Sequence, residues 1–364
     1  MKITLIAGAR PNFMKIAPVI DAIKNAQKQG KEIDYRLVHT GQHYDEKMSQ
    51  SFFKELEIPE PHINLNCGGG SQAAQTAAIM IHFENDLIDN PTDIVVVVGD
   101  VTSTMACSIV AQKLHTKVAH IEGGIRSGDW KMPEEINRLV TDSISNYFFT
   151  TSAQANENLA KAGIEKDRIF FVGNTMIDTL LKQMPRLKRP CFFEELSLKH
   201  KQYFVLTLHR PANVDKQENL NALLLEIIEH SGALPIVFPV HPRTRKQLEN
   251  LTLSYPNFHI VDPLGYLEFN YLVKYAKAVI TDSGGITEET TVMGVPCMTL
   301  RDTTERPETC TIGTNELLGT DPQAIKPAME KLFSGNWKKG AIPDLWDGKA
   351  AERIIESLLA TDGK

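Results

Sequence analysis

The segment from Thr281 to Pro296 contains residue types that suit the binding of a phosphate group. It reads TDSGGITEETTVMGVP and follows an apolar, strand-like run. Ser283, Gly284 and Gly285 stand where a helix is expected to begin, so free backbone N–H groups and the helix dipole would attract an anion. Glycine lacks a Cβ and lets a phosphate approach closely. A carboxylate further along the helix could hydrogen-bond a ribose, so the segment predicts a site for a nucleotide diphosphate. An ordinary strand-to-helix turn without a ligand could have the same sequence.

Carboxylates that could exchange protons follow two predicted strands in the first half of the chain. Asp100 and Glu122 each stand just after such a strand, and Pro133 opens a helix that carries Glu134 and Arg138 in its first turns. Carboxylates at separate strand and helix ends of one cleft suit general acid–base chemistry. Simpler interpretations stay open, because Asp100 could cap a helix, and the pair on the helix could be a surface ion pair.

Basic side chains stand at predicted strand ends in both halves. Within AGARPNFMK, Arg10 could fork onto phosphate oxygens, and Lys15 lies about a turn into the next helix. In the second half, His209 and Arg210 close a predicted strand and should face the same cleft. The segment RDTTERPET, residues 301–309, could complete a charged rim. These cations would suit a bound diphosphate.

Several cofactor signatures are absent from the sequence. It has no GxGxxG, no GxxxxGK[ST] and no grouping of His, Cys and Asp at metal-ligand spacing. We therefore expect no nicotinamide or other cofactor and no metal.

Composition indicates an ordinary two-domain enzyme. The 364 residues carry a net charge of −6, which argues against a general nucleic-acid or anionic-membrane binder. No apolar run approaches the roughly 18 residues that span a bilayer. The first residues, MKITLIAGARPN, fit a buried strand better than a signal peptide. Five cysteines without a CxxC pair indicate a reducing compartment, so we expect a cytoplasmic protein.

Short β-rich runs alternate with longer helical segments along the whole chain, including a helix expected over Asp45–Leu56. This alternation predicts an α/β protein of two Rossmann-like, doubly wound domains that face each other across a cleft. We place the domains at residues 1–183 and 184–348, and expect a C-terminal helix at 349–360 to pack back on the first domain. The expected strands are Ile3–Ala7, Tyr35–Thr40, Ile94–Val98, Lys117–Ile121, Tyr147–Thr150, Ile169–Val172, Tyr203–Leu208, Ile236–Pro239, His259–Val261, Ala278–Thr281 and Cys297–Leu300.

Motifs spread over nearly the whole chain resemble, in one order, those of the non-hydrolysing UDP-N-acetylglucosamine 2-epimerases. The matching segments are GARPNFMK, TGQHYD, GDVTST, EGGIRSGD, MPEEINR, GNTMID, LHR, PVHPR, TDSGGITEE and RDTTERPE. The resemblance implies a fold like that of the GT-B glycosyltransferases, a homodimer, and UDP held mainly by the second domain. One departure is Ala212, where the family commonly has a glutamate three residues after the histidine of the HR motif.

The resemblance also implies roles for single residues. The diphosphate would be held by Arg10, Ser283, Gly284 and Gly285, and the ribose by Glu289. The sugar would be surrounded by Lys15, Asp100, Glu122, Glu134, Arg138 and His209. In some bacterial members the region of Gln42 and His43 contacts a second, activating UDP-sugar.

An elimination mechanism fits these residues. The C2 proton of a GlcNAc unit adjoins no carbonyl, so UDP would leave C1 as a base removes that proton, and re-addition to the glycal would give the manno epimer. Positive charge from Arg10, the Ser283 helix end and Arg210 would stabilise the leaving diphosphate. Base and acid stay unassigned among Asp100, Glu122 and Glu134, and we expect His209 to assist the diphosphate.

The expected reaction is thus the epimerisation of UDP-N-acetylglucosamine for cell-surface polysaccharide precursors. One alternative is 2-epimerisation of a UDP-2,3-diacetamido uronic acid. Others are a GT-B glycosyltransferase and, given Ala212, a UDP-sugar sensor.

Overall fold

The computed structural model describes residues 1–41, 53, 55–240, 242–248 and 255–361, and it divides into two compact units. Unit 1 comprises Met1–Lys182 and Asp344–Lys364, and unit 2 comprises Gln183–Pro343. Within the described residues, no helix has the length and apolar character that crossing a membrane requires. The expected helix over residues 45–56 lies almost entirely outside the described residues.

Unit 1 is built on a parallel sheet with the strand order β3-β2-β1-β4-β5-β6-β7. The strands are β1 (Lys2–Ala7), β2 (Asp34–His39), β3 (Ile63–Asn64), β4 (Ile94–Val98), β5 (Lys117–Ile121), β6 (Tyr147–Thr150) and β7 (Ile169–Phe171). The helices are α1 (Arg10–Lys28), α3 (Gln72–Asp89), α4 (Thr102–Lys113), α5 (Pro133–Ile144), α6 (Ala153–Lys161), α7 (Thr175–Gln183) and α16 (Ala350–Thr361).

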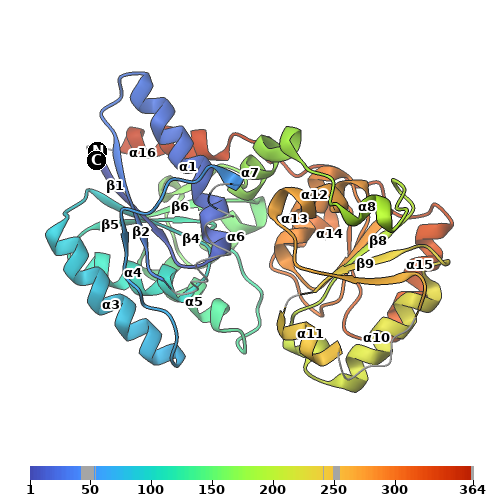
Figure 1. The fold of residues 1–364 in the computed structure, drawn as a ribbon. Coiled ribbons are helices and arrows are strands. Elements are labelled where there is room, and N and C mark those ends of the chain that lie inside the picture. The colour runs from blue at the N-terminus through green and yellow to red at the C-terminus, as the bar shows by residue number, and fades with distance from the viewer. Residues whose placement is uncertain (42–52, 54, 241, 249–254, 362–364) are drawn as a thin grey trace. The chain divides into compact units, whose positions relative to one another are not determined.

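Helices cover both faces of this sheet (Figure 1). Helices α3, α4 and α5 pack side by side, and α1 packs against α16. Each residue of β4, which reads IVVVV, is buried, as expected of a parallel strand enclosed between two layers. Because all strands are parallel, the loops after β1, β4 and β5 emerge at one edge of the sheet.

Unit 2 repeats this plan with the strand order β10-β9-β8-β11-β12-β13. The strands are β8 (Phe204–Thr207), β9 (Ile236–Pro239), β10 (Phe258–Val261), β11 (Ala278–Thr281), β12 (Cys297–Thr299) and β13 (Asn315–Leu317). The helices are α8 (Phe192–Glu195), α9 (Pro211–Val214), α10 (Gln217–His230), α11 (Pro242–Leu248), α12 (Tyr266–Tyr275), α13 (Gly284–Met293), α14 (Pro307–Thr311) and α15 (Ile325–Phe333).

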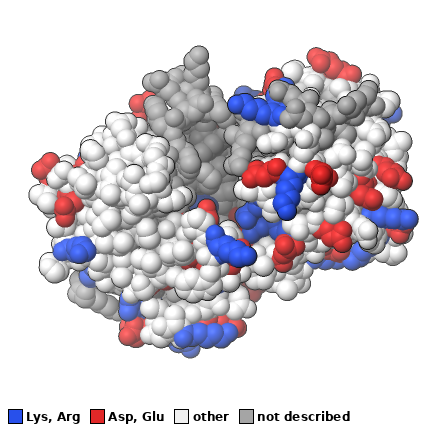
Figure 2. Space-filling model, turned by 90° about the horizontal axis from the view of Figure 1, so that it is seen from below, with Lys and Arg blue, Asp and Glu red and all other residues white. Residues whose placement is uncertain are grey.

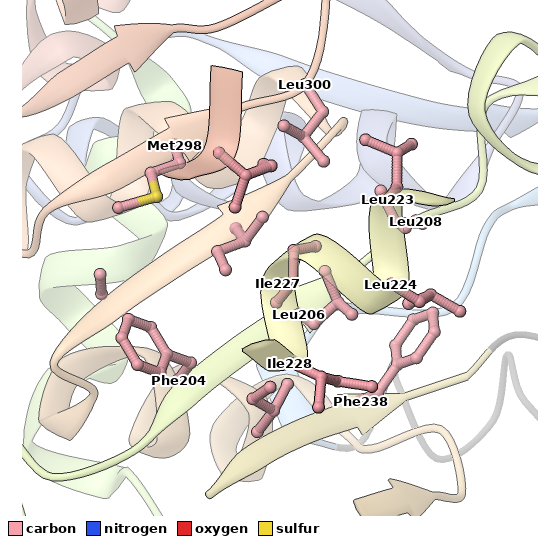
Figure 3. Close-up of a cluster of buried hydrophobic side chains, with 14 of the residues drawn as sticks. Phe204, Leu206, Leu208, Leu223, Leu224, Ile227, Ile228, Phe238, Met298 and Leu300 are labelled. Atoms are coloured by element: carbon pink, nitrogen blue, oxygen red, sulfur yellow. The ribbon is translucent and has the colours of Figure 1, made fainter. Parts of the chain in front are cut away.

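Alternate residues of β8 face two separate cores of unit 2. Phe204 and Leu206 join the cluster drawn in Figure 3, in which α10 contributes Ile227 among others. Val205 of β8 and Tyr203, which directly precedes the strand, belong to the cluster on the opposite face of the sheet. This period of two fixes which residues of β8 point to each face of the sheet, and the strand ends at Thr207, two residues before His209.

Two edge strands escaped the sequence analysis. β3 has two residues and β13 has three, and each pairs with the end strand of an otherwise predicted sheet. Segments this short show neither an apolar run nor a period of two, so only their pairing partners define them.

The C-terminal segment returns to unit 1 at Asp344 and ends in α16. The carboxylate of Asp178, on α7, accepts hydrogen bonds from the backbone N–H groups of Ala350 (3.1 Å) and Ala351 (2.7 Å). The indole N–H of Trp346 donates to the carbonyl of Thr151 (3.0 Å). These bonds fasten the first turn of α16 to unit 1, in addition to its packing on α1.

The contact of Asp178 with the first turn of α16 should make the unfolding free energy of the protein depend on pH. Burial raises the pKa of Asp178 to about 6, against the opposing hydrogen bonds from Ala351 and Ala350. The native state therefore binds this proton more tightly than the unfolded chain does. The stabilisation of the native state by protonated Asp178 is full below about pH 4 and is lost as the pH rises through about 6. The unfolding free energy of the wild type, relative to Asp178→Asn, should fall by about 2–3 kcal/mol between pH 4 and 7. Parallel denaturation curves for the two proteins over this range would contradict the assignment.

Candidate active site

Asp100, at the carboxyl end of β4, is held by side chains of α5. Its carboxylate pairs with Arg138 at 2.5 Å, and its backbone carbonyl accepts a hydrogen bond from Asn137 (2.8 Å). The N-cap of α4 is Val101, so Asp100 does not cap that helix. Its side chain keeps 31% of its surface exposed. Asp100 is thus a fixed, accessible carboxylate.

Glu122, after β5, is buried and paired with Lys15 of α1. The Lys15 ammonium lies 2.8 Å from the Glu122 carboxylate, and these side chains are 12% and 4% exposed. The backbone of Glu122 has a φ of 71°, in the left-handed region that a non-glycine residue occupies at a cost of roughly 1–3 kcal/mol. A Cβ added at Gly99 would lie 3.3 Å from the Lys15 ammonium. The loops after β4 and β5 therefore meet at this ion pair.

Arg138 lies between two carboxylates instead of forming a surface pair. It is 5% exposed and contacts both Asp100 and Glu135, the latter at 2.7 Å. Glu135 also accepts hydrogen bonds from the backbone N–H groups of Ser127 (2.9 Å) and Gly128 (3.0 Å). Burial opposes its ionisation, but these bonds and the one from Arg138 hold the pKa of Glu135 below its usual value. Glu135 thus secures the loop before α5, while Glu134 is half-buried in the first turn.

A buried histidine connects the loops that follow β4 and β5. His120, on β5, is fully buried; its Nε2 lies 2.8 Å from the carbonyl of Gly99, and its Nδ1 lies 2.7 Å from Asp142. Asp142 also accepts hydrogen bonds from the backbone N–H of Gly124 (3.0 Å) and from Arg126 (2.6 Å). Burial opposes ionisation of Asp142, yet the contacts with His120 and Arg126 lower its pKa.

Gly124 provides a direct test of how tightly this loop is held. Its φ is 82°, and a Cβ there would lie 2.4 Å from the carbonyl oxygen of Ala155. Gly128, in the same loop, has a φ of 73° and nothing within 4 Å of its Cβ position. Gly128→Ala should therefore cost only the backbone strain of about 1 kcal/mol, whereas Gly124→Ala should add roughly 1–3 kcal/mol of overpacking. Thermal denaturation of both variants checks this, and equal melting temperatures would contradict it.

In unit 2, His209 follows β8 and pairs with Asp282, which follows β11. The Nδ1 of His209 lies 2.8 Å from the Asp282 carboxylate, and the side chains are 53% and 0% exposed. Arg210 lies 3.9 Å from Glu305, which also forms two hydrogen bonds with Arg301 (2.7 and 2.6 Å). These charges therefore gather beside the beginning of α13.

The SGG turn forms the start of α13, as expected. Ser283 is the N-cap residue, and its side chain makes no capping hydrogen bond in the described structure. A Cβ at Gly284 would lie 3.5 Å from the Arg301 guanidinium and 3.7 Å from the Glu305 carboxylate. The first turn thus presents N–H groups, the hydroxyl of Ser283 and glycine surfaces, which suit an anion, beside the neutralised ion pair of Arg301 with Glu305.

Glu289 lies further along α13 and is buried. It accepts hydrogen bonds from the hydroxyl of Tyr266 (2.7 Å) and the amide of Asn270 (3.4 Å). Burial raises the pKa of Glu289 to about 7, although both hydrogen bonds oppose this. The neighbouring Glu288 forms an ion pair with Arg306. Of these two glutamates, Glu289 is the one with neutral partners.

Some predicted residues cannot be placed in this way. The backbone of Arg10 begins α1, but its side chain lies outside the described structure. Gln42 and His43 also lie outside the described residues.

Unit 2 also has a cavity of about 990 Å³. It lies at the amino-terminal edge of the sheet, opposite to the edge at which His209 and the beginning of α13 lie. It is lined by Pro235 and Asn257, which precede β9 and β10, and by residues of α10. None of its lining residues is among the predicted site residues.

Comparison with known proteins shows the family of this chain. The family model described as UDP-N-acetylglucosamine 2-epimerase matches residues 25–359. The chain belongs to this family. The UDP-N-acetylglucosamine 2-epimerase of Methanocaldococcus jannaschii is 41% identical over 98% of this chain and 99% of its own. The structure of that epimerase in complex with UDP-GlcNAc and UDP matches with a TM-score of 0.86 at 40% identity, covering 99% of this chain and 100% of that chain.

The family also includes relatives with a different named substrate. The UDP-2,3-diacetamido-2,3-dideoxy-D-glucuronate 2-epimerase of Pseudomonas aeruginosa is 39% identical over 98% of this chain and 99% of its own. The structure of Os79 from O. sativa in complex with UDP matches with a TM-score of 0.60 at 12% identity, covering 98% of this chain and 95% of that chain. That likeness concerns the fold alone, which is of the GT-B type expected for the epimerase family.

Two residues with clear contacts in the structure, His120 and Asp282, were not identified from the sequence, and Glu135 was not distinguished from Glu134. Glu135 stands beside Glu134, and sequence could not tell which of the two faces inward. His120 occupies a buried position in the apolar strand KVAHI, which is a signal that could have been used. Asp282 lies within TDSGG itself, but its partner His209 is distant in the sequence.

Proposed function

We propose that the protein interconverts UDP-N-acetylglucosamine and UDP-N-acetylmannosamine by epimerisation at C2. The observation that carries this proposal is the pair of carboxylates at adjacent strand ends of unit 1, each held against a cation. Asp100 contacts Arg138, and Glu122 contacts Lys15. Removal of a proton from one face of C2 and delivery to the other require two such groups in fixed positions.

The proposed reaction is an elimination followed by an addition. A carboxylate takes the C2 proton, the C1–O bond breaks with its electron pair passing to UDP, and a C1=C2 double bond forms. Protonation of C2 on the opposite face and return of the UDP oxygen to C1 complete the epimerisation without any change of oxidation state. Asp100, Glu122 and Glu134 are the candidates for base and acid.

Unit 2 would hold the UDP moiety through the beginning of α13. The N–H groups of Gly284 and Gly285 and the hydroxyl of Ser283 would bind the diphosphate, with Arg10, His209 and Arg210 supplying charge. Glu289 would accept hydrogen bonds from the ribose hydroxyls. Charge on the diphosphate grows as the C1–O bond breaks, so donors fixed at this position stabilise the transition state more than the substrate.

Proton NMR of the enzyme with UDP-N-acetylglucosamine in D₂O tests the proposal. We expect UDP-N-acetylmannosamine to appear and both epimers to carry deuterium at C2. A UDP-N-acetylglucosamine signal that stays unchanged and undeuterated would overturn the proposal.

A second candidate substrate is the UDP-2,3-diacetamido uronic acid, because the P. aeruginosa relative named for it is 39% identical to this chain. A uronate adds one carboxylate to the sugar and would need one more cation near it. The same NMR experiment with this substrate separates the two, since the true substrate should exchange its C2 proton at the higher kcat/KM.

We also propose that the epimer product feeds cell-surface polysaccharide precursors.

We further propose that the protein is a homodimer. Helix α3 carries an apolar stripe on its exposed side, formed by Ala74, Ala77, Ile81 and Ile88; the two isoleucines are 60% and 58% exposed. In Figure 2, which views the molecule from below, the surface over α3 to α5 is mostly free of charge. A second copy packing on the stripe would bury these side chains.

Ile81→Glu should shift the protein from dimer to monomer in size-exclusion chromatography with light scattering. Ile342→Glu is the matched control, because Ile342 is 53% exposed in unit 2. A wild type that is monomeric at micromolar concentration would reject the dimer, and a dimer unaffected by Ile81→Glu would reject the α3 interface.

A further inference from the structure

Asp282 is a buried carboxylate that joins the loop after β8 to the beginning of α13. It is 0% exposed and directly precedes Ser283. It accepts hydrogen bonds from the backbone N–H groups of His209 (3.0 Å) and Arg210 (2.9 Å) and from the side-chain amide of Asn213 (3.1 Å). Burial opposes its ionisation, but the bonds from His209, Arg210 and Asn213 hold the pKa of Asp282 below its usual value. Asp282 is therefore an ionised acceptor.

The contact between Asp282 and His209 decides which ring nitrogen of the histidine carries hydrogen. Oδ1 of Asp282 lies 2.8 Å from Nδ1 of His209. An ionised carboxylate only accepts hydrogen bonds, so Nδ1 must be the N–H donor. The His209 side chain is 53% exposed. With Nδ1 held by the buried carboxylate, Nε2 is the nitrogen left for a ligand.

We propose that Asp282 is a positioning residue that fixes His209 with Nδ1–H toward the protein and Nε2 toward the diphosphate of the UDP-sugar. This inference rests on the proposed function for the identity of the ligand, but the assignment of the ring nitrogens does not depend on it. With Nδ1–H donated to Asp282, an imidazolium form of His209 carries its second N–H at Nε2, on the side away from Asp282. That imidazolium donates a charged hydrogen bond to the leaving diphosphate.

The geometry predicts what an amide at this position would do. Oδ2 of Asp282 accepts three of its hydrogen bonds, so the amide oxygen of Asp282→Asn should take the place of Oδ2. The NH₂ group would then occupy the place of Oδ1 and donate to Nδ1 of His209. His209 would switch to the neutral Nε2–H tautomer, because a ring that accepts a hydrogen bond at Nδ1 carries no proton there, and it would present no positive charge to the diphosphate.

Long-range ¹H–¹⁵N NMR of the full-length protein labelled with ¹⁵N-histidine tests the tautomer directly, with His209→Gln to assign the signal. We expect neutral wild-type His209 to be protonated at Nδ1 and Asp282→Asn to show protonation at Nε2. Asn213→Ser is the matched control, since Asn213 also bonds to Asp282 but does not touch the ring; it should keep the wild-type tautomer. Wild-type His209 protonated at Nε2 alone would overturn the proposal without any variant.

Kinetics show whether the position of the ring matters for turnover. Asp282→Asn should lower kcat for the UDP-sugar by roughly 10–100-fold, the range found when a carboxylate that orients a metal-bound histidine is lost, and raise KM by a smaller factor. A tautomer switch with kcat unchanged would overturn the catalytic part of the inference. The wild type could bind and turn over no UDP-sugar while the tautomer still differs between the wild type and Asp282→Asn. That result would reject the proposed function and keep the assignment of Asp282.

Discussion

Glu122→Gln is expected to lower kcat for the epimerisation by about 10³-fold, the middle of the range for loss of a general acid or base. Glutamine keeps the shape and the left-handed backbone of the residue but can neither take nor give the proton at C2. It also leaves the Lys15 ammonium, now 2.8 Å from the carboxylate, facing a neutral amide. Deuterium incorporation at C2 and the rate of epimer formation measure the effect on the two steps separately.

Glu157→Gln is the matched control for this substitution. Glu157 lies on α6 in the same unit, and its side chain is 62% exposed in a pair with Lys161 at 3.7 Å. Its kcat should equal that of the wild type. If Glu122→Gln kept kcat within threefold of the wild type, Glu122 would lose its place among the proton-transfer groups, and Asp100 and Glu134 would remain.

Arg138→Met should cause the largest loss of stability among the substitutions considered. Arg138 is 5% exposed and separates the carboxylates of Glu135 and Asp100, so its removal leaves two carboxylates without their shared cation. Breaking a buried ion pair from one side costs about 3–5 kcal/mol. For a unit of this size that corresponds to a fall in melting temperature of roughly 6–20 °C.

Thermal denaturation of Arg138→Met is best compared with that of Lys161→Met. Lys161 pairs with Glu157, but both side chains are more than half exposed, at 73% and 62%. Such a pair contributes less than about 1 kcal/mol. Equal melting temperatures for the two variants would show that Arg138 does not hold the loops together, and its role would be limited to the substrate.

The sheet architecture was predictable because its strands carry a strong local signal. The run IVVVV of β4 needs no partner to be recognised, since uniform apolar character in a short segment indicates burial on both faces. The edge strands β3 and β13 lack such a signal and exist only through pairing. The chain's return to unit 1 was expected at residue 349, whereas the structure places it at Asp344.

The candidate site was predictable where position in the sheet selects the residue. Asp100 and Glu122 follow strands whose ends share one edge, and the structure brings their loops together. The partners of buried polar side chains are harder to predict from the sequence, because pairs such as His120 with Asp142 join residues that no sequence spacing relates. The segment RDTTERPET was expected to supply charges that could complete a rim. In the structure Arg301, Arg306 and Glu308 are buried, and the two arginines form ion pairs with Glu305 and Glu288, which sequence spacing alone did not predict.

The return of the chain to unit 1 makes unit 2 an insert within the chain of unit 1. Both junctions, Lys182/Gln183 and Pro343/Asp344, fall outside every strand, so each sheet is complete within its own unit. Unit 2 is therefore a cassette that could be exchanged for that of another family member without cutting a strand pairing. Truncation behaves differently, because loss of the last residues removes α16 from unit 1 and leaves the sheet of unit 2 whole.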